Sequence, residues 1–205
     1  LSLGPLLADD MGLGKTVEIL AYLEEVRSRY KDAKVLLVVP ASLLGNWGRE
    51  CMKFTPDLDF SIRHGKDAKK KDFPFLTIVT YQGAATSASI KEEKWDLVIL
   101  DEAQNIKNRN TKQTKSIKAL ERKQSIAMTG TPIENSLMNL WSIFDFLSPG
   151  LLGDEKDFES FSSSMAEDKM DNLKRVVTPF ILRRLKTDKS IINDLPDKVE
   201  NELMV

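Results

Sequence analysis

The sequence predicts an α/β fold in which a mainly parallel sheet is covered by helices on both faces. Short apolar runs, several of them rich in β-branched residues, alternate with segments whose apolar residues recur at helical spacing. The apolar runs lie at residues 35–39, 60–63, 76–80, 97–100 and 126–128. Runs of this kind suit parallel strands buried on both faces, and the helical segments at 111–120 and 137–147 supply cover for the sheet.

The chain begins with a predicted strand, loop and helix. Residues 3–8 can form a short buried strand, and residues 16–26 place Val17, Leu20 and Leu23 at helical spacing. The loop between them reads Asp9, Asp10, Met11, Gly12, Leu13, Gly14, Lys15 and Thr16. Its two glycines permit a tight turn that aims backbone N–H groups at a phosphate, and the following helix adds the positive end of its dipole. The loop therefore predicts a nucleotide-binding site.

Each polar residue at the end of this loop has an expected role. Lys15 would reach the β- and γ-phosphates, and the hydroxyl of Thr16 would bind Mg²⁺. The loop departs from the pattern G-x-x-x-x-G-K-[ST] because Asp9 stands at the first glycine position. A glycine-rich turn that only caps a core helix is the alternative. The strand, loop and helix context favours nucleotide binding.

Two adjacent carboxylates, Asp101 and Glu102, follow the apolar run at 97–100. They lie at the carboxyl end of a strand, where ligands bind in open α/β sheets. Asp101 is placed to hold Mg²⁺, and Glu102 to orient and deprotonate the water that attacks the γ-phosphate. Adjacent strand residues point in opposite directions, so both roles require the strand to end here. A strand that runs into an acidic helix N-terminus is the alternative.

Length and composition limit the remaining possibilities. The 205 residues fit one large domain, or a domain of residues 1–149 with a helical appendage at 150–205, where strand-like runs disappear. No apolar run approaches the roughly 20 residues that span a bilayer, and the N-terminus lacks an export signal, so we expect no membrane partner. One cysteine, Cys51, and one histidine, His64, exclude an internal disulfide and a zinc site of several soft ligands. A reducing compartment is expected.

The overall charge does not predict nucleic-acid binding. Thirty basic and 31 acidic residues give a net charge of −1, so any such binding must come from local patches. Residues 104–124 carry seven basic residues against one acidic residue, and residues 169–189 carry seven against two. Charge runs are usually solvated helix faces, and that interpretation stays open for both segments.

The order of motifs resembles one family. Thr129, Gly130, Thr131 and Pro132 follow another apolar run, after the loop and the acidic pair. This order resembles the helicase superfamily-two motors and, more narrowly, the SWI/SNF family of DNA-translocating and chromatin-remodelling ATPases. Further matching segments lie at residues 39–47, 80–81, 101–108, 140–141 and 180–186. An aspartate at the first loop position is what this family shows, and a glutamine at the position of Gln104 is common among its bacterial and archaeal members.

The resemblance implies a RecA-like P-loop motor lobe that binds ATP and Mg²⁺ and tracks double-stranded DNA. It makes Lys15, Glu102 and Gln104 the expected catalytic residues. The residues expected to lie along the DNA are Ser42, Thr80, Lys107, Thr129, Thr131, Arg183 and Arg184. Contacts to phosphate oxygens would suit a motor that steps along any sequence. For Arg183 and Arg184 a bracing role within the motor is the alternative, and Trp47 is expected to anchor the core rather than to stack on a base.

The resemblance also implies partners. A second RecA-like lobe would supply an arginine finger, which is worth roughly 10³ to 10⁵ in rate. Because the sequence stops at Val205, where the resemblance places the passage to that lobe, we expect the isolated chain to bind nucleotide and to hydrolyse it weakly. A DNA-bound protein would be the substrate of remodelling, and the sequence does not identify it. The expected location is the nucleoid in a prokaryotic cytoplasm, or the nucleus in a eukaryote.

Three other functions fit parts of the sequence. An RNA or DNA helicase is the first, and its strand-separating activity differs from translocation on duplex DNA. A GTPase switch or a small-molecule kinase shares the phosphate loop, but Asn105, Ile106, Lys107 and Asn108 do not form the Asn-Lys-x-Asp guanine reader. A non-catalytic interaction module is the third alternative, and the intact Lys15 argues against it.

Overall fold

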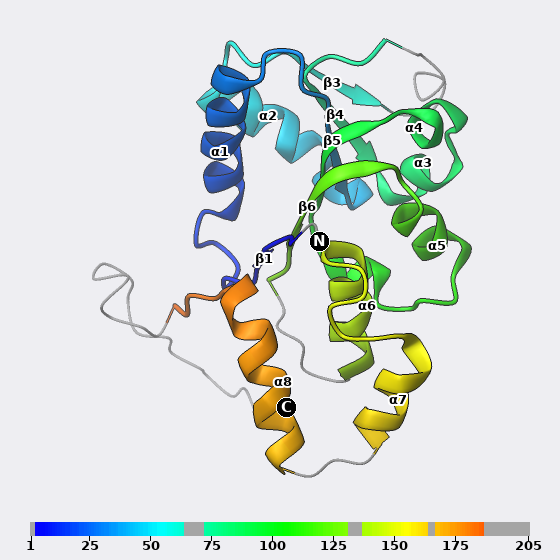
Figure 1. The fold of residues 1–205 in the computed structure, drawn as a ribbon. Coiled ribbons are helices and arrows are strands. Elements are labelled where there is room, and N and C mark those ends of the chain that lie inside the picture. The colour runs from blue at the N-terminus through cyan, green and yellow to red at the C-terminus, as the bar shows by residue number, and fades with distance from the viewer. Residues whose placement is uncertain (1–2, 64–71, 131–136, 164–166, 187–205) are drawn as a thin grey trace, which may run out of the picture.

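The computed structural model describes residues 3–63, 72–130, 137–163 and 167–186. Its centre is a parallel sheet of seven strands in the order β3-β4-β2-β5-β6-β1-β7 (Figure 1). The strands are β1 (Leu6–Leu7), β2 (Val35–Val39), β3 (Phe60–Arg63), β4 (Leu76–Thr80), β5 (Trp95–Leu100), β6 (Arg122–Met128) and β7 (Ile181–Leu182). The α/β fold with a parallel sheet, predicted from the apolar runs, is confirmed.

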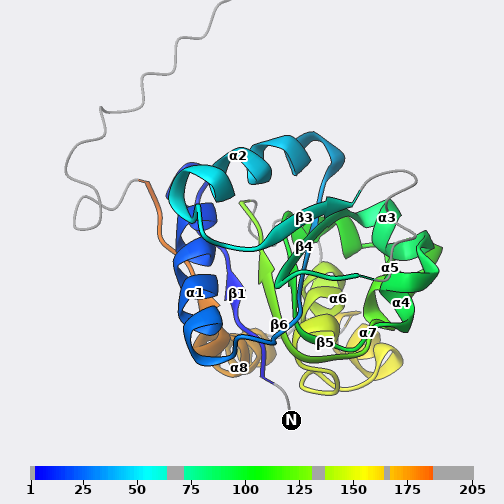
Figure 2. The ribbon, with the colours of Figure 1, turned by 90° about the horizontal axis from the view of Figure 1, so that it is seen from above.

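Helices cover both faces of the sheet, as predicted. One face carries α1 (Lys15–Arg29) and α2 (Leu44–Phe54), and the other carries α3 (Tyr81–Thr86), α4 (Ala88–Glu92), α5 (Lys112–Lys118) and α6 (Leu137–Leu147) (Figures 1 and 2). Successive residues of β2 pack into opposite layers: Leu36 and Val38 lie in the core with α3 to α6, and Leu37 and Val39 lie in the core with α1 and α2. This alternation is why the strand is apolar at every position.

The buried face of α1 differs from the predicted one at its start. Leu20 and Leu23 are buried as expected, together with Ile19, whereas Val17 is 39% exposed. Val17 lies in the first turn of the helix, beside the phosphate loop, and it lines an open pocket there instead of the core.

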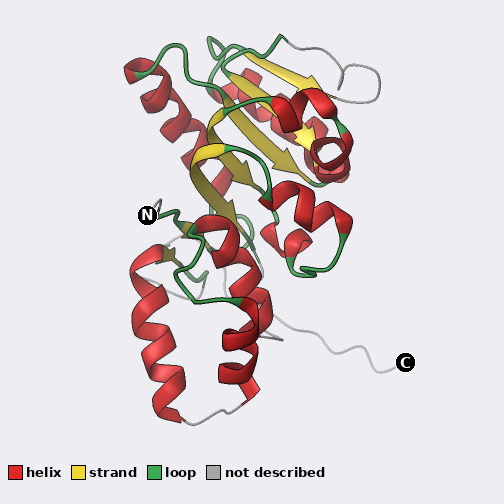
Figure 3. Ribbon diagram, turned by 45° about the vertical axis from the view of Figure 1, so that its right-hand side comes forward, coloured by secondary structure: helices red, strands yellow, loops and turns green. Residues whose placement is uncertain are grey.

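The chain after Gly150 forms two helices and then returns to the sheet. Helices α7 (Glu155–Ser163) and α8 (Glu167–Val177) extend away from the sheet (Figure 3), and β7 then pairs in parallel with β1. The expectation that strands end before residue 150 is wrong for β7. This strand has only two residues and is defined by its pairing with Leu6 and Leu7, so it leaves no periodic pattern in the sequence. Within the described ranges, no helix combines the length and the apolar character needed to cross a membrane.

Candidate nucleotide-binding site

The predicted phosphate loop joins β1 to α1. Gly12 and Gly14 adopt φ angles of +82° and +85°, a left-handed conformation that side chains disfavour. Gly14 directly precedes the first helical residue, so the unpaired N–H groups at the start of α1 face the loop. Gly130 lies against this loop, since a Cβ there would approach Met11 Cγ to 2.7 Å. Gly130 and the phosphate loop are therefore in direct contact.

Lys15 is held inside the loop. Its Nζ donates hydrogen bonds to the carbonyl oxygens of Asp9 at 2.6 Å and of Asp10 at 3.0 Å. The ammonium group of Lys15 therefore lies at the loop, and it is the kind of group that forms charge-assisted hydrogen bonds to phosphate oxygens.

The acidic pair follows the end of β5 at Leu100, as its two roles require. Glu102 adopts a left-handed backbone conformation, with φ +50° and ψ +58°, and this turns its side chain away from the direction the strand would impose. Trp47 Nε1 donates to Asp101 Oδ2 at 2.7 Å, and Asp101 Oδ1 accepts from the backbone N–H of Glu102 at 2.9 Å. Burial raises the pKa of Asp101, the Trp47 hydrogen bond opposes that rise, and the charge of Glu102 adds to it.

Gln104 links the acidic pair to the Thr-Gly-Thr turn. Its Nε2 donates to Glu102 Oε2 at 2.7 Å, and its Oε1 accepts from the hydroxyl of Thr129 at 2.9 Å. The hydroxyl of Tyr81, at the start of α3, donates to the carbonyl oxygen of Asp101 at 2.8 Å. The side chain and the backbone of the acidic pair are thus both fixed by hydrogen bonds to neighbouring motifs.

The structure brings the predicted nucleotide-site residues together. Lys15, Thr16, Asp101 and Glu102 all line one cavity of about 330 Å³ at the carboxyl edge of the sheet. The Thr16 hydroxyl and the Asp101 carboxylate offer the oxygen ligands that Mg²⁺ prefers. Among the described residues no group of three or more acidic, histidine or cysteine side chains could hold a metal alone. This donor set fits Mg²⁺, whose remaining ligands are commonly water and substrate phosphates.

Asp9 fills the first loop position with a buried carboxylate. It is 0% exposed, and it accepts hydrogen bonds at Oδ1 from the backbone N–H of Arg184 at 2.7 Å and at Oδ2 from Arg184 Nε at 2.8 Å. Of the two roles that the sequence left open for Arg184, this geometry favours bracing within the domain. Arg183 is exposed, and its role stays a prediction.

The residues expected along the DNA are not equivalent in the structure. Ser42 and Lys107 are exposed. Thr80 caps α3, since its Oγ1 accepts from the backbone N–H of Gly83 at 3.0 Å. Thr129 is only 1% exposed and bonds to Gln104, so its side chain lies inside the site and not on a surface that DNA could reach. Thr131 lies outside the described residues.

Much of the basic run at 104–124 is engaged within the domain. Arg109 forms ion pairs with Glu155 and Glu159, and Lys118 pairs with Asp145 at 2.9 Å. The other two engaged side chains are Arg122, which donates to the backbone carbonyl oxygens of 118, 120 and 146, and Lys123, which pairs with Asp96. Four of the seven basic side chains are therefore paired or hydrogen-bonded within the domain. The charge count alone overstates how much positive charge this segment offers to a nucleic acid.

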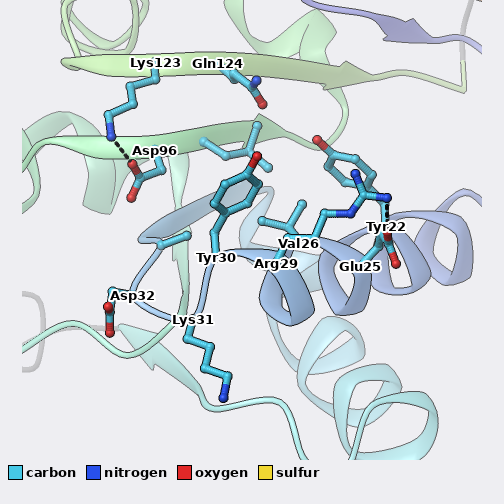
Figure 4. Close-up of a pocket in the computed structure, with 12 residues that line it drawn as sticks. Tyr22, Glu25, Val26, Arg29, Tyr30, Lys31, Asp32, Asp96, Lys123 and Gln124 are labelled. Carbon is cyan, nitrogen blue, oxygen red and sulfur yellow. Dashed lines mark ion pairs between the residues drawn. The ribbon is translucent and has the colours of Figure 1, made fainter.

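A second cavity lies at the opposite edge of the sheet. It measures about 770 Å³ and lies between the end of α1 and the starts of β5 and β6. Figure 4 shows Tyr30 pointing toward these strands, beside the ion pair of Lys123 and Asp96. None of the predicted site residues lines it.

The hydrogen bonds that hold the site residues were not predicted from the sequence, and two of these contacts join residues far apart in the chain. The bond from Trp47 to Asp101 and the pairing of Arg184 with Asp9 join residues 54 and 175 positions apart. The sequence did contain one signal for the pairing of Arg184 with Asp9. Asp9 stands in place of a loop glycine, and a buried carboxylate needs a basic partner.

The phosphate loop, the acidic pair that follows β5 and the all-parallel sheet define a P-loop nucleotide-binding domain of the RecA type. The model of the SNF2-related domain matches residues 1–205, so the chain belongs to this family. This confirms the resemblance found in the motifs.

Known relatives agree with that assignment. YwqA of Bacillus subtilis is 38% identical, over 97% of this chain and 23% of its own length. The chromatin-remodeling ATPase INO80 of Eremothecium gossypii is 36% identical, over 97% of this chain and 16% of its own length. Among solved structures, the Sulfolobus solfataricus SWI2/SNF2 ATPase core in complex with dsDNA superimposes with a TM-score of 0.87 at 43% identity, over 97% of this chain and 44% of that one. The chain thus spans less than a quarter of either curated relative.

Proposed function

We propose that this chain is the ATP-binding lobe of a DNA-dependent ATPase that translocates on double-stranded DNA and remodels DNA-bound protein complexes, without obligatory strand separation. The observation that carries the proposal is the convergence of Lys15, Thr16, Asp101 and Glu102 on one cavity. The Sulfolobus relative was solved with dsDNA, and the Eremothecium relative is named a chromatin-remodeling ATPase, which supports the choice of duplex DNA and of remodelling.

The residues of the cavity divide the work of hydrolysis. Lys15 would bind the β- and γ-phosphates, and Thr16 and Asp101 would hold Mg²⁺, which neutralises charge on the phosphates. Glu102 would orient the attacking water and accept its proton. Gln104, which bonds to both Glu102 and Thr129, would keep the carboxylate of Glu102 aimed at that water.

DNA would be held by its backbone. Ser42 and Lys107 are exposed and offer a hydroxyl and an ammonium group to phosphate oxygens. Such contacts carry no sequence information and therefore suit movement along any duplex. A second RecA-like lobe is proposed as the partner that completes the ATP site with an arginine finger.

ATP hydrolysis measured with duplex DNA, single-stranded DNA and RNA tests the proposal. In a protein that continues into the second lobe, duplex DNA should stimulate hydrolysis most. Glu102→Gln should lower turnover by about 10² to 10⁴ while a fluorescent ATP analogue still binds. Stronger stimulation by single strands or RNA would instead support a strand-separating helicase, and equal use of GTP would support a different class of P-loop enzyme.

A further inference from the structure

The segment that follows β7 lies directly on the phosphate loop. The backbone N–H of Ala8 donates to the carbonyl oxygen of Leu182 at 2.7 Å, and that of Asp10 donates to the carbonyl oxygen of Arg184 at 3.2 Å. In return, the backbone N–H of Lys186 donates to Asp10 Oδ2 at 3.0 Å. Lys186 also crosses the loop itself, since a Cβ added to Gly12 would lie 3.3 Å from its Nζ. Two segments about 175 positions apart in the sequence are thus locked together beside the nucleotide cavity.

Arg184 is the centre of this contact. Its guanidinium pairs with Asp9 through Nε and Nη2, and the same Nη2 reaches Glu18 in the first turn of α1. A buried carboxylate is costly without a charged partner, and a planar guanidinium that bonds to two carboxylates at once fixes their relative positions. Through Asp9 and Glu18, Arg184 therefore holds both ends of the phosphate loop.

The loop residues that bond to this segment are also those that bond to Lys15. Lys15 Nζ bonds to the carbonyl oxygens of Asp9 and Asp10, the two residues whose side chains accept from Arg184 and Lys186. If Lys15 binds a phosphate instead, Asp9 is still held by Arg184, and Asp10 is still held by the backbone of Arg184 and Lys186. Without these contacts the loop would have to be ordered at the moment of binding, at a cost in affinity.

We infer that Arg184 is a positioning residue for nucleotide binding: it pre-orders the phosphate loop through Asp9 and Glu18, and nucleotide in the loop in turn stabilises the docking of residues 182–186. The second part follows from the first, because coupling between two binding events is reciprocal. The inference rests on the proposed function, since it assumes that the loop binds ATP. The inferred coupling joins the nucleotide site to residues 182–186, at the end of β7 and just after it.

Two measurements on the chain test the inference. The first is the affinity for a fluorescent, non-hydrolysable ATP analogue with Mg²⁺. Arg184→Lys keeps the positive charge but cannot bond to both carboxylates in the same geometry, and it should weaken binding about ten-fold or more. The matched control is Arg29→Lys. It alters an exposed ion pair with Glu25 at the far end of α1, the helix that carries Glu18, and it should leave the affinity unchanged.

The second measurement is made first on the unsubstituted chain, where its result does not depend on how well Arg184→Lys folds. Amide hydrogen exchange at Arg184 and Lys186 should slow several-fold in the unsubstituted chain when the analogue is added, and Arg184→Lys should reduce this protection. Unchanged affinity in Arg184→Lys, or exchange that the analogue does not slow, overturns the inference while the proposed function stands. Failure of the unsubstituted chain to bind any nucleotide overturns both.

Discussion

The two edges of the sheet carry cavities of opposite character. The cavity at the amino edge, about 770 Å³, is the larger, and its charged groups include exposed pairs such as Lys123 with Asp96. The cavity at the carboxyl edge, about 330 Å³, is lined by Lys15, Asp101 and Glu102. Each is held by a hydrogen bond: Lys15 donates to its own loop, Asp101 accepts from Trp47 and Glu102 accepts from Gln104. Size alone would select the edge that none of the predicted site residues lines.

The difference follows from how parallel strands are connected. The loops that follow parallel strands all begin at the carboxyl edge of the sheet, so residues distant in sequence come together there. The cavity at the amino edge is instead lined by the end of α1 and by the first residues of β5 and β6, whose polar side chains pair with each other. Convergent polar groups held in place, and not empty volume, identify the site.

The strongest test of this comparison exchanges one lysine at each edge for alanine. Lys15→Ala removes the ammonium group that the loop holds for a phosphate, and binding of a fluorescent ATP analogue should fall by about 100-fold or more. Lys123→Ala, the matched change at the amino edge, removes one exposed ion pair and should alter binding by less than about two-fold. Equal losses in the two variants would mean that the carboxyl edge has no special role.

Two buried tryptophans, Trp47 beside the nucleotide cavity and Trp95 away from it, allow a second comparison. Trp47 and Trp95 are both 1% exposed, and each donates one hydrogen bond from Nε1, to Asp101 at 2.7 Å and to the carbonyl oxygen of Ile90 at 3.0 Å. Each change to phenylalanine removes one buried donor and should lower the free energy of unfolding by about 1–3 kcal/mol.

Only Trp47→Phe should also affect the metal. Because Trp47 orients the carboxylate expected to hold Mg²⁺, its loss should raise the Mg²⁺ concentration needed for nucleotide binding by about ten-fold. Trp95→Phe should leave that concentration unchanged. Mg²⁺ titration of analogue binding, with the unfolding free energy measured in parallel, separates the two effects. A shift of similar size in both variants would show that Trp47 acts only through stability.

The sequence predicted the parts of the site that are local. The loop from Asp9 to Thr16 and the pair Asp101 and Glu102 could be placed because each motif follows an apolar run, and runs of this kind form parallel strands whose ends meet. The fold class followed from the same runs. Both predictions rest on neighbours in sequence, which backbone geometry relates directly.

The parts that escaped prediction depend on pairing across the sheet. Arg184 reaches Asp9 only because the two-residue strand β7 pairs with β1, and a strand that short has no periodicity to read. Thr129 was expected to lie along the DNA, whereas its side chain is buried and its hydroxyl donates to Gln104. The burial of a polar side chain depends on a partner that the local sequence does not contain.

The last test concerns the helix that carries Trp47, and it measures the rigidity of that helix instead of nucleotide binding. Cys51 lies one turn further along the same face of α2, fully buried, and burial raises the pKa of its thiol to about 11. Since the thiolate is the reactive form, a thiol reagent should modify the native chain far more slowly at pH 8 than the unfolded chain. It is the only cysteine, so the signal is unambiguous.

The raised pKa of Cys51 makes both the stability of the fold and the rate of thiol modification depend on pH. Because the native pKa lies above the unfolded value of about 8.5, burial of the neutral thiol stabilises the fold fully below pH 8.5, and this contribution is lost as the pH rises toward 11. Modification of the native chain should therefore keep accelerating up to about pH 11, whereas that of the unfolded chain levels off near pH 9. A native rate equal to the unfolded one at pH 8 would show that α2 opens readily. The hydrogen bond from Trp47 could then not hold Asp101 in a fixed position, and the contrast between a pre-ordered carboxyl edge and a merely hollow amino edge would lose its main support.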